Sequence, residues 1–431
     1  MADNPFPDWF TFNGTHRSRV EVLDGQFRPS LDGGDQLVAF RTTLALRVER
    51  ETFDAEFELM DSRQSLSDRG TPLGTDDVNS LALLQASIGV GLQDYLGADA
   101  VSFRLGRQTM DLGGRRLIAR NRFRNTVNSF TGLSAQWYRG KDLRLNSFYF
   151  LPVSRRPSGF NRLIDHDIQI DQESFSRRLW GLHGERSGLW FDSVGEAYLV
   201  RLDESDTIRE PSKNRKLFSP GLRWLRRSKV GQFDFDIEGV GQFGQSRATR
   251  SAVDPLDLDH RAWMTHVEFG YTSSYNFHPR LSLIYDIASG DRNPIDAEQN
   301  RFDTLYGARR FEYGPTGILG AFARSNISSP GYKLLLQPRE NWNVMMAHRF
   351  FRLASEKDAW TTTGMRDISG LSGSDLGNQL ETRVRWQALP QRLLVELGFA
   401  RIWGGGFIEA NMPAGRQINT NYGYVQLGLT F

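Results

Sequence analysis

The densest group of side chains that could do chemistry is a run of arginines between Phe103 and Phe130. The stretch FRLGRQTMDLGGRRLIARNRFRNTVNSF holds little acid and seven arginines: Arg104, Arg107, Arg115, Arg116, Arg120, Arg122 and Arg124. A guanidinium is always charged and pairs with carboxylates through two parallel hydrogen bonds. The stretch therefore indicates anion binding at a constriction. The competing interpretation is a solvated external loop or a lipopolysaccharide contact.

Arginine supplies almost all the positive charge of the chain. Of 53 basic residues only six are lysines, and they nearly balance 51 acidic residues to a net charge of +2. This balance predicts no nucleic-acid partner. A GC-rich genome would also favour arginine codons, so the excess of arginine over lysine could reflect codon usage as well as function.

Other chemistry is weakly represented. The chain has no cysteine and seven scattered histidines, without an H-E-x-x-H or G-x-S-x-G motif. An outer-surface hydrolase would have to use His16 or His348. The acidic segments Ile164–Asp171 and Asp254–His260 fit solvated loops better than calcium sites, because their spacing matches no known calcium loop. We therefore predict no enzyme activity, no metal and no cofactor.

Strict alternation of side chains defines the elements that position the arginines. In LVAFRTTLALRVE, Val38, Phe40 and Leu44 share one parity, whereas Arg41 and Arg47 share the other. The same period of two recurs in TFDAEFEL and QFDFDIEGVGQF. Period two belongs to the pleated strand and not to a helix.

This test predicts about eighteen strands of roughly ten residues each. Their approximate starts are Phe10, Leu37, Thr52, Leu81, Asp99, Thr131, Asp142, Ser176, Leu189, Lys216, Gly231, Arg261, Arg280, Arg324, Asn341, Gly377, Gln391 and Thr420. Alternation is blurred at Ser176, Lys216 and Arg324. Short connections, such as Arg139–Asp142, alternate with long ones, such as Thr109–Phe130 and Gly290–Ala323. That alternation is typical of outer-membrane barrels.

The fold prediction is all-β: a single transmembrane antiparallel β-barrel over residues 1–431, with short periplasmic turns and long extracellular loops. Mean hydropathy is −0.47, which a barrel tolerates because only alternate residues face lipid. Aromatic residues near strand ends and the terminal Phe431 favour the bacterial outer membrane over a soluble β-sandwich or propeller. The start MADNPFPDWF lacks a signal peptide, which indicates a mature chain with a replacement Met1.

If the apolar parity faces lipid, the opposite parity faces the lumen, because arginine at mid-bilayer costs roughly 2–4 kcal/mol. The inward arginines are then Arg17, Arg19, Arg41, Arg47, Arg104, Arg144, Arg223, Arg349, Arg383 and Arg385. Inward acids include Asp54, Glu56, Glu58, Asp192, Glu196, Asp234, Asp236, Glu238, Asp286, Glu381 and Glu396. They predict either a lattice of ion pairs or a surplus of arginines that contacts a passing anion.

The stretch GRQTMDLGGRRLIARNRF resembles the hallmark of the alginate export family of outer-membrane proteins. The segments Ser289–Gly314 and His348–Trp360 are similar to that family too. The resemblance covers essentially the whole chain and implies an eighteen-stranded monomeric barrel that passes a polyuronate. Carried over residue by residue, it makes Arg104, Arg107 and Arg116 constriction cations, with Arg349 and Arg352 from the later segment. The chain is short for a dedicated alginate exporter, which leaves the cargo open.

We therefore predict an anion-selective channel for passive export or diffusion of an acidic polysaccharide such as alginate. The expected substrate-binding residues are Arg41, Arg47, Arg104, Arg107, Arg116, Arg349, Arg352, Arg383 and Arg385. Expected partners are outer-membrane lipid, lipopolysaccharide and the anionic solute, and the protein is expected to be a monomer. The alternatives are a general porin for small carboxylates or other anions, an outer-membrane enzyme or adhesin, and a soluble all-β binding protein.

Overall fold

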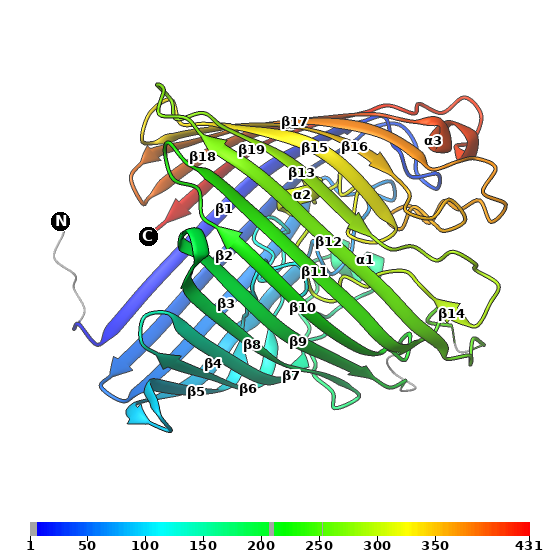
Figure 1. Cartoon of the computed structure of the whole chain (residues 1–431). Coiled ribbons are helices and arrows are strands. Elements are labelled where there is room, and N and C mark those ends of the chain that lie inside the picture. The colour runs from blue at the N-terminus through cyan, green and yellow to red at the C-terminus, as the bar shows by residue number, and fades with distance from the viewer. Residues whose placement is uncertain (1–6, 207–210, 252) are drawn as a thin grey trace.

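The computed structural model describes residues 7–206, 211–251 and 253–431, and it is a closed antiparallel β-barrel (Figure 1). Residues 1–6, among them the expected replacement Met1, lie outside the described residues. Strand β1 closes the ring by pairing with both β2 and β19. The predicted eighteen-stranded barrel is confirmed.

Eighteen long strands in the described part form the wall in chain order. They are β1 (Phe10–Asp24), β2 (Asp35–Arg50), β3 (Phe53–Ser65), β4 (Asn79–Tyr95), β5 (Ala98–Gln108), β6 (Phe130–Arg139), β7 (Leu143–Pro152), β8 (Arg177–Leu189), β9 (Ser193–Glu204), β10 (Lys216–Arg226), β11 (Phe233–Ser246), β12 (Leu258–Thr272), β13 (Arg280–Ala288), β15 (Ile327–Leu336), β16 (Trp342–Arg352), β17 (Asp375–Leu389), β18 (Leu393–Trp403) and β19 (Thr420–Thr430). The additional β14 (Glu298–Gln299) has two residues and pairs in parallel with β12.

Every predicted strand start lies within a few residues of an observed one, including the three with blurred alternation. The largest departure is at Leu189, where the 3₁₀ turn η1 (Trp190–Asp192) precedes β9. Phe191 in this turn has a φ of 62°, which breaks the extended backbone. Asp192, which was expected to face the lumen, instead lies in the exposed turn and pairs with Lys229.

The two rims of the barrel differ in the length of their connections. Residues 51–52, 96–97 and 140–142 join strands at the rim that holds both described chain ends, whereas long loops crowd the other rim (Figure 1). The long loops used below are L2 (66–78), L3 (109–129), L4 (153–176), L7 (289–326) and L8 (353–374). Outer-membrane barrels keep short turns in the periplasm, so the long loops are extracellular.

Helices are few and short. They are α1 (Phe160–Ile164) in L4, α2 (Arg310–Tyr313) in L7 and α3 (Gly406–Asn411) between β18 and β19. None of the helices in the described residues is long and apolar enough to cross a membrane.

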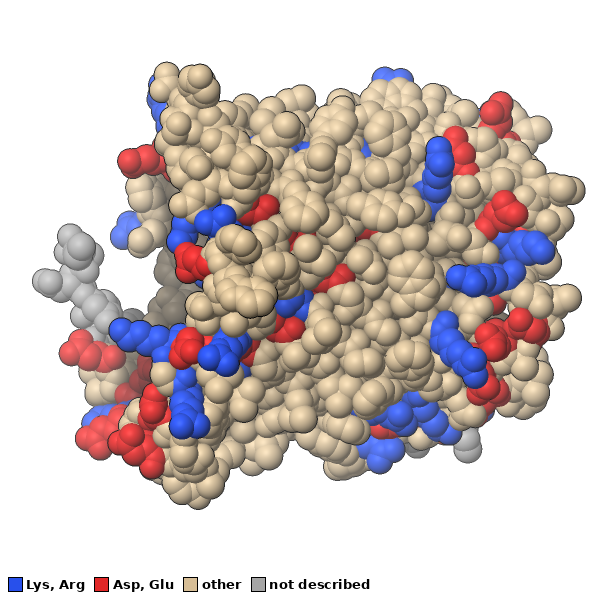
Figure 2. Space-filling model, in the orientation of Figure 1, with Lys and Arg blue, Asp and Glu red and all other residues tan. Residues whose placement is uncertain are grey.

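The outward parity of the strands is apolar and exposed. Leu105, Leu222, Leu283 and Leu427 belong to it, and Figure 2 shows a mostly uncharged band between two charged rims. At the seam, the main chains of Gly14 and Phe431 exchange two hydrogen bonds. A Cβ at Gly14 would lie 2.1 Å from the Phe431 ring, so the terminal aromatic residue packs in the space that this glycine leaves.

The extracellular half of the lumen is filled by loops that have their own apolar core. L3, L7, L8 and the α3 segment contribute to one buried cluster with wall residues, including Ile118, Leu319, Trp360 and Phe407. The rings of Phe322 in L7 and Phe351 in β16 stack with centroids 3.6 Å apart. Burying a large apolar side chain contributes about 1.5–3 kcal/mol, so this cluster holds the loops inside the barrel.

Candidate functional site

Loop L3 crosses the lumen, and Arg17 and Arg41 are among the wall arginines that hold it there. Arg17 of β1 donates hydrogen bonds to the main-chain carbonyls of Arg122 (2.9 Å), Phe123 (3.0 Å) and Arg124 (3.0 Å). Arg41 of β2 donates to the carbonyls of Arg124 (3.0 Å) and Arg122 (3.2 Å). Within the described residues neither guanidinium has a carboxylate at salt-bridge distance. Both therefore position L3 without a carboxylate partner.

Asn125 fixes the next position of L3 and is almost completely buried. Its Nδ2 lies 2.9–3.1 Å from the carbonyl oxygens of Phe40, Arg63 and Asp77. Its Oδ1 accepts a hydrogen bond from Arg17 at 2.8 Å. A buried amide with all its partners satisfied holds a loop in one conformation, so the stretch around Arg124 is a rigid part of the lumen.

The other end of L3 is tied to L7 through a buried ion-pair network. Arg116 pairs with Glu238 and with Asp236 (3.3 Å) of β11, and with Glu312 (3.0 Å) of α2. Glu312 also pairs with Arg324 at 2.7 Å. Burial alone would lower the pKa of Arg116, but Glu238 and Glu312 more than offset it, so this pKa lies well above the usual value. Arg116 is a neutralised anchor.

The wall beside this anchor is also neutralised. Arg349 of β16 pairs with Asp286 (2.8 Å) and donates to the carbonyl of Glu312 (2.8 Å). Asp286 in turn accepts from His266 at 2.7 Å. Arg223 of β10 pairs with Asp236 at 2.7 Å and with Glu196 at 2.9 Å. Most of the charged lumen residues described here on strands β9 to β16 thus form ion pairs with one another.

A cavity of about 1040 Å³ opens toward the extracellular loops, and we call it the vestibule. Three acidic side chains line it, Asp76, Glu204 and Asp303, against eleven basic ones: Arg28, Arg124, Arg155, Arg156, Arg177, Lys213, Arg215, Arg247, Arg250, Arg301 and Arg309. Its lining is therefore strongly positive. A low-dielectric cleft concentrates the potential of the charges that line it.

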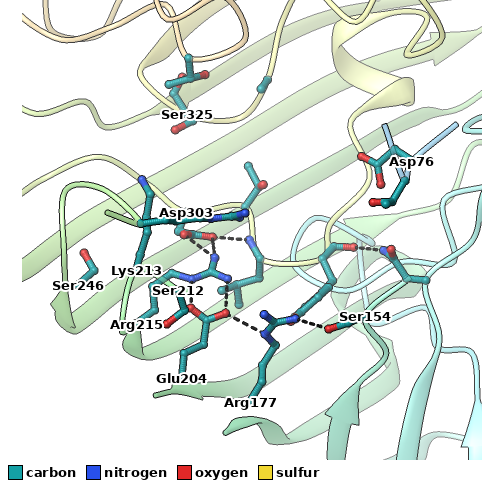
Figure 3. A pocket seen from close by; sticks show the side chains of 18 of the residues that line it. Asp76, Ser154, Arg177, Glu204, Ser212, Lys213, Arg215, Ser246, Asp303 and Ser325 are labelled. Atoms are coloured by element: carbon teal, nitrogen blue, oxygen red, sulfur yellow. Dashed lines mark hydrogen bonds and ion pairs between the residues drawn. The ribbon is translucent and has the colours of Figure 1, made fainter. Parts of the chain in front are cut away.

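The vestibule contains both fixed and unneutralised cations. Figure 3 shows Arg215 between Glu204 and Asp303, at 2.7 and 2.8 Å, with Arg177 on the far side of Glu204 at 3.2 Å. In the described part of the chain, Arg28, Lys213, Arg250 and Arg309 have no carboxylate at salt-bridge distance. Burial lowers the pKa of Arg28 and of Arg309 to about 10, so both remain charged at neutral pH.

A second cavity, of about 380 Å³, lies on the periplasmic side of L3, and we call it the lower chamber. Its acids are Asp111 and Glu396, and its basic residues are Arg17, Arg115, Arg122, Arg124, Arg310, Lys333, Arg383 and Arg385. Among the lining residues, Arg124 alone is shared by the vestibule and the lower chamber. Arg124 pairs with Asp76 at 2.7 Å and marks the passage between them.

Two smaller cavities, of about 220 and 460 Å³, lie against strands between β6 and β15. Four basic and three acidic residues line the first, and three of each sign line the second. Their linings are close to neutral, unlike those of the vestibule and the lower chamber.

The nine arginines expected at the site fall into two groups, those with a carboxylate partner and those without one in the described residues. Six have carboxylate partners: Arg47 with Glu49, Arg104 with Asp54, Arg107 with Glu173, Arg116 with three acids, Arg349 with Asp286, and Arg385 with Glu396. The other three, Arg41, Arg352 and Arg383, have none in the described residues. Arg383 and Arg385 line the lower chamber.

Arg107 and Arg352 do not lie with the lumen residues. Arg107 shares the strand face of Leu105, which is 55 % exposed on the outside of the barrel. Arg352 is exposed and alternates with Phe351, which is fully buried. Both sit at the extracellular ends of their strands. They were predicted to be constriction residues because they belong to family motifs, although the alternation along each strand places them on the outward face.

The cavity-lining residues contributed by L2 and L7 were not singled out from the sequence. Arg309, Arg310 and Glu312 come from the GARRFEYG part of L7, and Asp76 comes from L2. The double arginine in GARRFEYG was the available signal. Loops lack the period of two, so no parity shows that these residues turn inward.

The remaining candidate sites stay apart in the structure. His16 contacts Thr42 and Ser18, and His348 contacts Tyr332 and Asn378, on the outward face. Neither histidine has a carboxylate beside it in the described residues. The segments proposed and rejected as calcium loops contribute to no cluster of three metal-binding side chains in the described part of the chain.

The fold is shared with solved outer-membrane porins. The chain superposes on OpdL of Pseudomonas aeruginosa with a TM-score of 0.62, at 11 % identity, covering 98 % of both chains. It superposes on OccAB3 of Acinetobacter baumannii with a TM-score of 0.60, at 12 % identity, covering 98 % of this chain and 99 % of that one. For OccK2 (OpdF) of P. aeruginosa in complex with glucuronate the score is 0.60, at 11 % identity, covering 98 % of both.

No curated protein sequence matches the chain. The sequence profile of the alginate export family matches residues 8–420, nearly the whole chain. Together with the barrel and the lumen described above, this match confirms the resemblance seen in the arginine-rich motif. The chain belongs to the alginate export family and is a channel of the bacterial outer membrane.

Proposed function

We propose that the channel is selective for anions and carries carboxylated sugars across the outer membrane by passive diffusion. The observation that carries this proposal is the charge of the two cavities that meet at Arg124. Basic residues outnumber acidic ones by eleven to three in the vestibule and by eight to two in the lower chamber. Rings of arginine select anions by making the potential along the path favourable.

The spacing of acids between these cations supports passage rather than permanent binding. Asp76 accepts hydrogen bonds from Arg124 and Arg155, and Glu204 from Arg177 and Arg215. A conducting site must attract an ion and still release it. Carboxylates that compete for the same guanidinium groups keep the hold on a passing anion weak.

The size of the path favours single uronates and short oligomers. The vestibule, at about 1040 Å³, reaches the upper end of ordinary ligand pockets, whereas the lower chamber measures about 380 Å³. OccK2 (OpdF), a protein with the same fold, has been seen in complex with glucuronate. This chain offers the same chemical class of solute an arginine-lined route. The closed ring needs no second copy to complete its lumen, which favours a monomer.

Export of a polyuronate such as alginate is the second candidate, and membership of the alginate export family favours it. An extended polymer would have to thread past Arg124 without displacing the rigid stretch of L3. The two candidates differ in the length of the solute that passes.

Reversal potentials in planar bilayers under a salt gradient test the selectivity. We expect a clear preference for chloride over potassium, and a preference for potassium would overturn the proposal. Liposome-swelling rates then test the cargo. Glucuronate should enter faster than the uncharged glucose, while entry of alginate oligomers at a rate that does not fall with length would favour the polymer exporter. A barrel without measurable conductance would favour an enzyme or an adhesin.

A further inference from the structure

We propose that the outer surface of the barrel carries a binding site for the phosphate groups of lipopolysaccharide. It lies at the extracellular ends of β8, β9 and β10, and we call it the rim patch. Its charged residues are Arg178, Arg201, Asp203 and Lys216. All four alternate with buried lumen-facing residues, such as Leu202, so they belong to the outward parity.

The strand register arranges the residues of the rim patch in rows across β8, β9 and β10. The polarity of these rows changes along the strands as it does along an amphiphilic lipid. At the top level Asp203 pairs across the sheet with both Arg178 and Lys216. One level below, Arg201 is flanked by Trp180 and Phe218. The next level toward the membrane centre is fully apolar: Leu182, Leu199 and Pro220. The residues therefore pass from charged to aromatic to aliphatic within three levels.

The rim patch carries an excess of positive charge. Its single carboxylate, Asp203, is occupied by Arg201, whose Nε and Nη2 lie 2.9 and 2.7 Å from Asp203 Oδ1. Arg178, which is exposed, and Lys216 have no carboxylate at salt-bridge distance within residues 7–206, 211–251 and 253–431. Two cations, one on each strand that flanks β9, therefore have no carboxylate partner in the described residues, and phosphate binds such groups through charge-assisted hydrogen bonds.

The apolar levels identify the source of the phosphate as a lipid. Leu182 is 56 % exposed and Leu222, farther along β10, is 68 % exposed, so acyl chains can lie directly below the charged level. A free phosphate would make no use of this surface. Figure 2 shows charged residues of both signs along the long-loop rim next to the uncharged band. On that side the outer membrane presents phosphorylated glycolipid, and basic residues near an anionic lipid surface strengthen binding.

The same strands provide a matched control at the opposite rim. Arg186 on β8 and Arg226 on β10 share the outward parity of Arg178 and Lys216 but lie at the periplasmic ends. The full-length protein in detergent is titrated with bisphosphorylated lipid A and with phosphate-free lipid A, and binding is read by native mass spectrometry. The variants are R178Q/K216Q and R186Q/R226Q, each first checked for the heat-modifiable gel shift of a folded barrel.

We expect R178Q/K216Q to bind bisphosphorylated lipid A about tenfold more weakly than the unmodified protein. R186Q/R226Q should bind it as the unmodified protein does, and phosphate-free lipid A should bind all three proteins equally weakly. Equal binding of bisphosphorylated lipid A to R178Q/K216Q and the unmodified protein would overturn the proposal. So would an equal loss in R186Q/R226Q, or inorganic phosphate binding as tightly as lipid A.

Discussion

The lumen has two walls that use arginine in opposite ways. On β1, β2 and β17, Arg17, Arg41 and Arg383 have no carboxylate partner in the described residues. On β10 to β13, Arg223 and its neighbours are paired with acids at 2.7–2.9 Å. Arg17 and Arg41 hold L3 by its peptide carbonyls, so no carboxylate in the described residues competes with a solute for these two or for Arg383. Arginines of the second wall are neutralised and serve as anchors, so residue type alone does not reveal the role.

The largest effect should come from breaking the anchor on the second wall. In E312Q, Arg116 loses one of its three carboxylates, and Arg324 loses the one ion pair that it makes in the described residues. Removing one partner of a buried pair costs about 3–5 kcal/mol, and that cost falls on the docking of L7. We expect larger and noisier single-channel conductance than in the unmodified protein.

The control for this experiment is E49Q. Glu49 pairs with Arg47 at 2.9 Å, and both side chains are exposed, so the pair contributes little. Identical conductance traces for E312Q and E49Q would show that the buried network does not hold L7.

Loosening L3 at the first wall should have the next largest effect. N125A removes the amide that contacts three main-chain carbonyls and Arg17, leaving buried polar groups unpaired at about 1–3 kcal/mol each. We expect protease cleavage within L3 and conductance that fluctuates between levels. The matched control is N411A in α3, whose amide makes one hydrogen bond in the described part of the chain, to the carbonyl of Phe407. If L3 resists protease in N125A as well as it does in N411A, the assignment is contradicted.

Charge removal should distinguish the two walls directly. R383Q removes an uncompensated charge from the lower chamber, so the anion preference should fall severalfold. The double variant R104Q/D54N removes an ion pair and no net charge, so its reversal potential should match that of the unmodified channel. If R104Q/D54N lowers the selectivity as much as R383Q does, the distinction between free and paired arginines fails.

The smallest effect is a pH dependence from Asp77 in L2. Burial, and then the neighbouring Asp76, raise the pKa of Asp77 from 3.8 to about 7. Protonated Asp77 stabilises the docked conformation of L2. This stabilisation is fully present below about pH 4 and is lost as the pH rises to about 7. Above that, a negative charge appears near Arg124. We expect weaker anion selectivity at pH 8 than at pH 6, and D77N should abolish the difference.

The wall of the barrel was predictable from sequence because its physics is local. Lipid on one side and water on the other force alternation on each strand, so the start at Lys216 was found although Leu217 and Pro220 blur the pattern. Arg41 and Arg383 were placed in the lumen by the same rule. Arg107 and Arg352 were misplaced because a motif outweighed parity at the strand ends.

The loops inside the barrel were not predictable in the same way. Arg116 was expected to be a constriction cation, and its three carboxylate partners come from β11 and α2, more than a hundred residues away. Arg124, which joins the two cavities, was one of seven similar arginines in its stretch. Only the docking of L3 against β1 and β2 distinguishes it, and that docking depends on contacts between segments far apart in sequence.

The apolar cluster that holds the loops inside the barrel changes what an electrical recording measures. In an empty cylinder the number of strands would determine the current. Here L3, L7 and L8 pack through residues such as Ile118, Phe322 and Trp360, so the open cross-section depends on whether a small protein core stays folded. Each local unfolding of that core should change the current, so the current noise of a single molecule is expected to report the folding equilibrium of the core.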